Sequence, residues 1–154
     1  MAKYTKDHVR DYATEAFRFY AKVGGEKKYI DTLVEEMKRQ EKQRDGIKDS
    51  GICKPTEAAL MRKETVLRDR AAEIADLAAV EKTLHIVGSC VSGREVRLSM
   101  ENVYFKDPWK DLEKGDIHDR VHYCEIHIPA SERQIYRWLK KARLTFAEER
   151  GLRL

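Results

Sequence analysis

The sequence predicts an all-α protein, and three observations support that class. Apolar residues recur with the spacing of a single helical face from Val9 to Val23. Leucine and isoleucine recur every seven residues in the middle of the chain, as they do in long helices that pack together. A serine followed three residues later by glutamine marks a helix start near the C-terminus. A chain of 154 residues is long enough for one or two hydrophobic cores. With 42% hydrophobic and 38% charged residues, it has enough apolar side chains to make wholesale disorder unexpected.

The first expected helix covers Val9 to Val23 and ends at Gly24-Gly25, because glycine readily adopts the positive φ of a helix end. A second helix follows, marked by the apolar residues Ile30, Leu33, Val34 and Met37. The polar run from Lys38 to Asp49 has almost nothing to bury. We expect it to form a frayed helix end and then a linker.

A long helix is expected to start at Lys54-Pro55-Thr56-Glu57 and to run to about Val87. Its apolar stripe is formed by residues at seven-residue intervals, namely Leu60, Leu67 and Ile74, with Leu77 and Leu84 on a neighbouring stripe. This spacing favours packing against another helix. Gly88 is the expected stop, and 87–93 the expected flexible joint. The chain is therefore predicted to divide into a helical region, 1–88, and a C-terminal module, 94–154.

The C-terminal module is predicted to begin with a short helix from Glu95 to Phe105 that ends before Pro108, with Trp109 and Leu112 closing over its end. A further helix carries Ile117, Val121 and Cys124 on one face. Pro129 interrupts it, because proline lacks a backbone donor and favours an extended residue before it. The last helix starts at Ser131, where Ser131-x-x-Gln134 forms a capping box.

The last helix has two different faces. Its apolar face consists of Ile135, Trp138, Leu139, Ala142 and Phe146, and the remainder carries Glu132, Arg133, Tyr136, Arg137, Lys140 and Lys141. A short helix, a tight turn and a helix with a basic outer face form the layout of a helix-turn-helix, whose second helix enters the DNA major groove. A surface helix rich in arginine is the alternative interpretation.

The distribution of charge agrees with a site for a polyanion at the C-terminal end. The net charge is +4, with 31 Lys+Arg against 27 Asp+Glu. Residues 131–154 contain seven of the cations and three of the carboxylates, so this segment accounts for the entire excess and the preceding 130 residues are neutral. A neutral body with a basic end is typical of a protein that contacts nucleic acid at that end.

The C-terminal sequence also resembles a known family. Ser-Glu-Arg-Gln-Ile-Tyr-Arg-Trp-Leu-Lys-Lys-Ala-Arg-Leu at 131–144, continued by Thr-Phe-Ala-Glu-Glu-Arg-Gly-Leu, resembles the end of region 4 of sigma-70-type factors. There, a Ser-x-x-x-Val-x-x-x-Leu-x-x-Ala-like recognition helix runs into a Leu/Phe-x-x-x-Leu-like helix end. The resemblance covers about residues 94–152 and points to the short sigma-like transcriptional regulators of phages and prophages. The chain has Glu125 and Pro129 where the family turn has a small residue and glycine, so we expect a longer or differently shaped turn.

The resemblance implies binding of a promoter element in double-stranded DNA. The predicted DNA-binding residues are Ser131, Glu132, Arg133, Gln134, Tyr136, Arg137, Lys140 and Lys141. Ser131 is the cap of the recognition helix, whereas Lys140 and Lys141 are expected beside the phosphate backbone. The N-terminal region has aromatic residues, but their surroundings do not match the promoter-melting region 2 of the family; these residues are Tyr12, Phe17, Phe19 and Tyr20. An accessory regulator is therefore expected rather than a complete sigma factor. Its N-terminal region would serve dimerisation or contact with RNA polymerase.

Two other functions fit the sequence. A phage small-terminase-like packaging subunit also combines a helix-turn-helix with helices for oligomerisation. A helical protein-binding adaptor would need no DNA at all.

Catalytic and cofactor sites are not expected. The three cysteines are too far apart for zinc ribbons, and the spacing in His118-x3-His122-x-Cys124-x2-His127 matches no zinc finger. No phosphate-binding glycine loop or nucleophile motif is present. No apolar run approaches the roughly 20 residues of a membrane span, and the N-terminal residues carry no signal-peptide pattern. We therefore expect a cytoplasmic protein without metal or cofactor.

Overall fold

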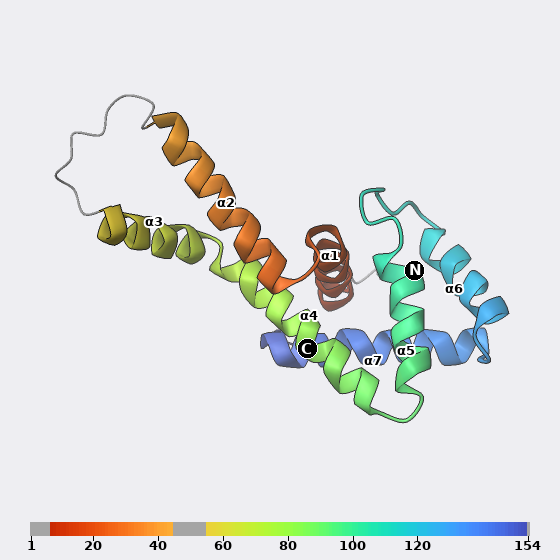
Figure 1. Cartoon of the computed structure of the whole chain (residues 1–154). Coiled ribbons are helices and arrows are strands. Elements are labelled where there is room, and N and C mark those ends of the chain that lie inside the picture. Colours follow the sequence, from red (N-terminus) through yellow and green to blue (C-terminus); the bar gives the residue numbers. More distant parts are fainter. Residues whose placement is uncertain (1–6, 45–54, 154) are drawn as a thin grey trace, which may run out of the picture.

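The computed structural model describes residues 7–44 and 55–153, and within those ranges it contains helices and no strand. In chain order the elements are α1 (His8–Val23), α2 (Glu26–Arg44), α3 (Pro55–Asp69), α4 (Ala71–Ser89), α5 (Gly93–Met100), the π-helical segment η1 (Glu101–Phe105), α6 (Asp116–His127) and α7 (Glu132–Arg150) (Figure 1). The predicted all-α class is confirmed. None of the helices in these ranges is long and apolar enough to cross a lipid bilayer.

The helices form a body and an arm. We call α2 and α3 the arm, because they lie beside each other and project away from the remaining helices, which form the body (Figure 1). The base of the arm is fixed to α4. The backbone N–H of Glu26 donates to the Glu81 carboxylate at 3.0 Å, and the Tyr29 hydroxyl donates to Glu73. Burial, and then the hydrogen bond to Glu73, raise the pKa of Tyr29 to about 12.

One hydrophobic core fills the body and receives side chains from α1, α4, α5, η1, α6 and α7. Its centre is aromatic: the ring of Phe17 lies 5.2 Å from that of Tyr104 and 5.5 Å from that of Phe146. All three side chains are buried. The core thus crosses the boundary that the sequence predicts between 1–88 and 94–154, and helices from both parts stabilise it.

The predicted long helix is wrong in one respect, because it is two helices. The chain leaves helical geometry at Arg70, with φ −106° and ψ 16°, and this residue separates α3 from α4. The two apolar stripes have different surroundings on either side of that break: Leu60 of the first stripe, on α3, is 58% exposed, whereas Leu77 of the neighbouring stripe, on α4, is fully buried. Repeating leucines therefore mark a helical face, but not one continuous helix. Of the polar run at 38–49, the described part as far as Arg44 is helical, and 45–54 lie outside the described residues.

The predicted short helix at 95–105 is present as α5 and η1, but the segment after it differs from the prediction. Trp109 does not close over the helix end, since its side chain is 79% exposed. The loop is held instead by Arg18, a buried side chain of α1 that donates to the backbone carbonyls of Asp107, Pro108 and Lys110. A guanidinium can satisfy several carbonyls at once, whereas an indole has one donor. Burial lowers the pKa of Arg18.

We expect Phe17→Ala to lower the free energy of unfolding by about 3–5 kcal/mol, because truncation of a buried aromatic leaves a cavity where α1, η1 and α7 meet. Phe19→Ala, at a half-buried position next to Tyr29, is the matched control and should cost much less. Urea unfolding followed by circular dichroism measures both. Equal losses for the two variants would contradict the central role of Phe17.

Candidate nucleic-acid interface

A helix, a four-residue turn and a second helix follow one another at the C-terminal end. The sequence predicts a longer or differently shaped turn, and residues 128–131 form a turn with extended backbone at both ends. Ile128 has φ −119° and ψ 135°, and its side chain is buried. The turn lets α6 cross the N-terminal part of α7 steeply (Figure 1).

The start and end of α7 are well defined. The Ser131 side chain accepts a hydrogen bond from the backbone N–H of Gln134 at 3.2 Å, so the serine part of the predicted capping box is present. Gly151 ends the helix in the left-handed conformation, with φ 75°, and donates to the carbonyls of Ala147 and Glu148. The Ser131 cap is a local signal, which is why the sequence predicted where this helix starts.

The apolar face of α7 fixes its rotation about its own axis. Ile135, Leu139, Ala142 and Phe146 are fully buried and belong to the body core. Trp138, predicted to lie in that core, is half-buried and packs against its edge. Because α7 contacts α1, α4, α5 and α6, its opposite face is the one that remains exposed.

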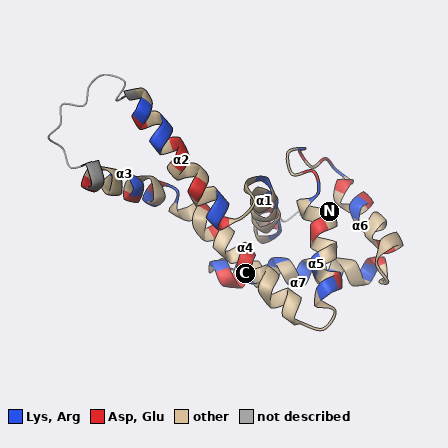
Figure 2. Ribbon diagram, in the orientation of Figure 1, with Lys and Arg blue, Asp and Glu red and all other residues tan. Residues whose placement is uncertain are grey.

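Four cations lie on this exposed side. We call Arg133, Arg137, Lys140 and Lys141 the basic face; all four side chains are exposed. None of them makes an ion pair or side-chain hydrogen bond with another residue of the described ranges. Figure 2 shows Lys and Arg along α7. Unpaired, solvated cations in successive turns can contact phosphates and base edges without first breaking internal contacts.

The other predicted residues lie at the edge of the basic face. Glu132 and Tyr136 point toward α6, where His118 Nδ1 lies 3.5 Å from the Glu132 carboxylate and 3.1 Å from the Tyr136 hydroxyl. Burial, followed by the charge of Glu132, raises the pKa of Tyr136. The side chain of Gln134 is exposed. Glu132 and Tyr136, two of the predicted DNA-binding residues, therefore have intramolecular contacts that the sequence did not indicate.

Other arginines of the basic segment stabilise the fold. Arg143 donates to the Tyr104 hydroxyl at 2.8 Å, and Arg150 pairs with Asp76 of α4 at 2.7 Å. The hydrogen bond to Asp76 raises the pKa of Arg150. The charge count of residues 131–154 thus overstates the cations available to a ligand, which are concentrated in the first three turns of α7.

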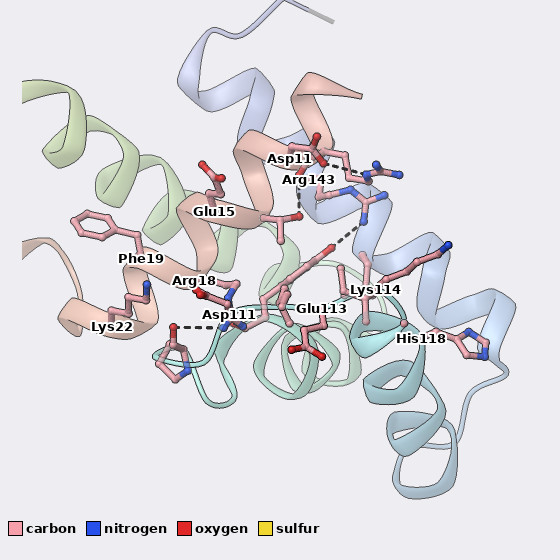
Figure 3. A pocket seen from close by; sticks show the side chains of 18 of the residues that line it. Asp11, Glu15, Arg18, Phe19, Lys22, Asp111, Glu113, Lys114, His118 and Arg143 are labelled. Carbon is pink, nitrogen blue, oxygen red and sulfur yellow. Dashed lines mark hydrogen bonds and ion pairs between the residues drawn. The ribbon is translucent and has the colours of Figure 1, made fainter. Parts of the chain in front are cut away.

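A cleft of about 1120 Å³ lies beside the basic face, between α1, the loop before α6, and α7. It is lined by cations, including Lys114 and Arg143, and by carboxylates, including Asp11 and Glu113 (Figure 3). The sequence does not indicate this cleft, because its lining residues come from segments far apart in the chain. Because its lining carries both signs of charge, the cleft does not enlarge the positively charged surface formed by the basic face.

The histidines and the cysteine of the motif at 118–127 lie on different sides of α6. Cys124 is buried in the core and burial raises the pKa of its thiol, whereas His122 lies near Glu125 and His127 packs on Tyr123. Across the described ranges, no three His, Cys, Asp or Glu side chains are arranged to hold a metal ion.

Comparison of the chain with protein-family models, curated proteins and solved structures found no match.

We expect Ser131→Ala to destabilise the protein by about 1 kcal/mol, because the N–H of Gln134 loses its acceptor. Ser131→Asp should retain stability, since aspartate also caps and its charge is favourable at a helix N-terminus. Chemical unfolding of the three proteins compares them. An alanine variant as stable as the parent would show that this cap contributes nothing.

Proposed function

We propose that the protein is a sequence-specific regulator of transcription that binds double-stranded DNA through α7. The observation that supports this most strongly is the basic face: four exposed, unpaired cations on a capped helix whose opposite face is buried. An α-helix fits the major groove of B-DNA, which is about 12 Å wide. In this proposal α6 crosses the DNA backbone while α7 lies in the groove.

The first two turns of α7 would read the bases. Arg133 and Arg137 lie there, one turn apart and on the same exposed side. Arginine can form two parallel hydrogen bonds with the O6 and N7 atoms of guanine. Tyr136 and Glu132 would contribute at the edge of the groove, positioned by His118.

The next turn would contact the DNA backbone. Lys140 and Lys141 follow the proposed base-reading residues, where a recognition helix leaves the groove. Flexible ammonium groups neutralise phosphates without reading sequence, and they release condensed counterions when they bind. The resemblance to sigma region 4 supports a promoter as the target, a phage or prophage regulator as the class of protein, and the cytoplasm as its place of action.

The direct test is selection of bound duplexes from a random pool by the full-length protein, followed by anisotropy titration of an enriched and a scrambled duplex. The proposal expects a common sequence in the enriched pool and tighter binding of that duplex. If no duplex binds even at low salt, the chain is not a DNA-binding regulator and the protein-binding adaptor gains support.

We expect Arg133→Ala and Arg137→Ala each to weaken binding of the enriched duplex by about 1–3 kcal/mol, because each removes a bidentate base contact. Binding of the scrambled duplex should change much less. Lys63→Ala, an exposed cation of the arm, is the control and should leave both affinities unchanged. Equal losses on both duplexes would assign the two arginines to phosphates.

We expect the double variant Lys140→Gln with Lys141→Gln to reduce the slope of log K against log salt by about two, because two phosphate contacts are lost. Preference for the enriched duplex should hardly change. Titrations at several salt concentrations give the slope. An unchanged slope would mean that this turn of α7 does not lie along the DNA.

A further inference from the structure

A histidine joins the two helices of the candidate interface beside the basic face. His118 lies in the first turn of α6, and its Nδ1 atom is 3.1 Å from the Tyr136 hydroxyl and 3.5 Å from the Glu132 carboxylate. Glu132 and Tyr136 are one turn apart, so they lie on the same side of α7. They directly precede Arg133 and Arg137 in the sequence. One ring atom of α6 thus contacts both neighbours of the proposed base-reading arginines.

The charge of His118 decides what this contact does. Neutral imidazole has one N–H donor and one acceptor nitrogen, whereas the charged ring has two donors. Beside a neutral ring Glu132 keeps its full negative charge, but a charged ring forms an ion pair with it. Histidine changes charge between about pH 5 and 8. The side chain of His118 is 62% exposed, so it can exchange protons with the solvent.

The other titratable and charged groups around His118 are mixed in sign. Those that line the same part of the cleft come from α1, η1, the loop before α6 and α7, and are Arg10, Asp11, Tyr104, Glu113, Lys114 and Arg143 (Figure 3). Farther from His118 in that view are Glu15, Arg18, Lys22 and Asp111. Within the described residues, only Glu132 and Tyr136 are bound by the ring itself. A proton on His118 therefore acts first on Glu132.

DNA would favour the charged ring. With α7 in the major groove, the Glu132 carboxylate in its first turn lies near phosphates, and like charges repel. A charged His118 offsets this repulsion. Because coupling between two bound species is reciprocal, DNA that favours the protonated ring is itself bound more tightly by the protonated protein. The gain is present at low pH and is lost as the pH rises and the ring releases its proton.

We propose that His118 is a positioning residue that makes DNA binding by α7 respond to pH. With a proton, its ring pairs with Glu132, holds Tyr136 beside the basic face and strengthens binding. Without the proton, Glu132 opposes the phosphates and binding weakens. This inference rests on the proposed function, since it concerns regulation of the same interface.

The response is measured by anisotropy titration of the enriched duplex with the full-length protein at about pH 5.5 and about pH 8, at one ionic strength. The parent protein should bind about fivefold or more tightly at the lower pH. His118→Gln cannot take up the proton, so it should lose most of this difference through weaker binding at the lower pH. His118→Lys is charged at both pH values and should bind more tightly than the parent at pH 8.

The pairing of His118 with Glu132 needs its own variant. Glu132→Gln should also remove most of the pH response, because no carboxylate remains for the proton to offset. Adding His118→Gln to this variant should reduce the response no further, since residues that act as a pair are not additive. A response that falls again in the double variant would contradict the pairing.

His122→Gln is the matched control. His122 is another exposed histidine of α6 with its Nδ1 atom 3.5 Å from a carboxylate, but that carboxylate belongs to Glu125 of the same helix. This variant should keep the full pH response, and circular dichroism at both pH values checks each fold. A parent with equal affinity at both pH values, or a His118→Gln variant with the full response, would overturn the inference and leave the DNA-binding proposal intact. If no duplex binds at either pH, both proposals are wrong.

Discussion

Burial of the apolar face of α7 is the interaction on which the rest of the structure depends. Ile135, Leu139 and Phe146 have no exposed surface, and Phe146 packs on Phe17 of α1, which in turn contacts Tyr104. This contact joins segments from both ends of the chain into one core. It also fixes the rotation of α7, so the opposite side, with Arg133 and Arg137, must face outward.

The same core divides the cations into two kinds. Arg18 and Arg120 donate to backbone carbonyls around η1, while Arg143 and Arg150 bind Tyr104 and Asp76. These guanidiniums serve as multidentate donors that hold helices and loops together. The side chains of the basic face make no such internal contacts within the described residues. A net charge therefore says little about available charge until the internal contacts are known.

Local signals predicted much of the fold. Helices α1, α6 and α7 follow from apolar spacing, and the start of α7 follows from Ser131. The break at Arg70 and the exposure of Trp109 could not be predicted, because neither depends on neighbouring residues alone. The break lies where the thinly packed arm joins the packed body. The 106–110 loop is held by Arg18, which lies some 90 residues earlier in the chain and donates to carbonyls of the loop.

The candidate site shows the same limit. The four members of the basic face could be found from helical spacing, since the apolar face at 135, 139, 142 and 146 dictates which residues lie opposite. The contact of His118 with Glu132 and Tyr136 required knowing how α6 crosses α7.

Side-chain NMR of the full chain during titration with a selected duplex tests most directly whether α7 enters the groove. If α7 lies in the groove, the guanidinium signals of Arg133 and Arg137 should shift strongly. Those of Arg18 and Arg150, which are held by internal contacts, should shift little. Shifts confined to other parts of the molecule, with Arg133 and Arg137 unmoved, would contradict it.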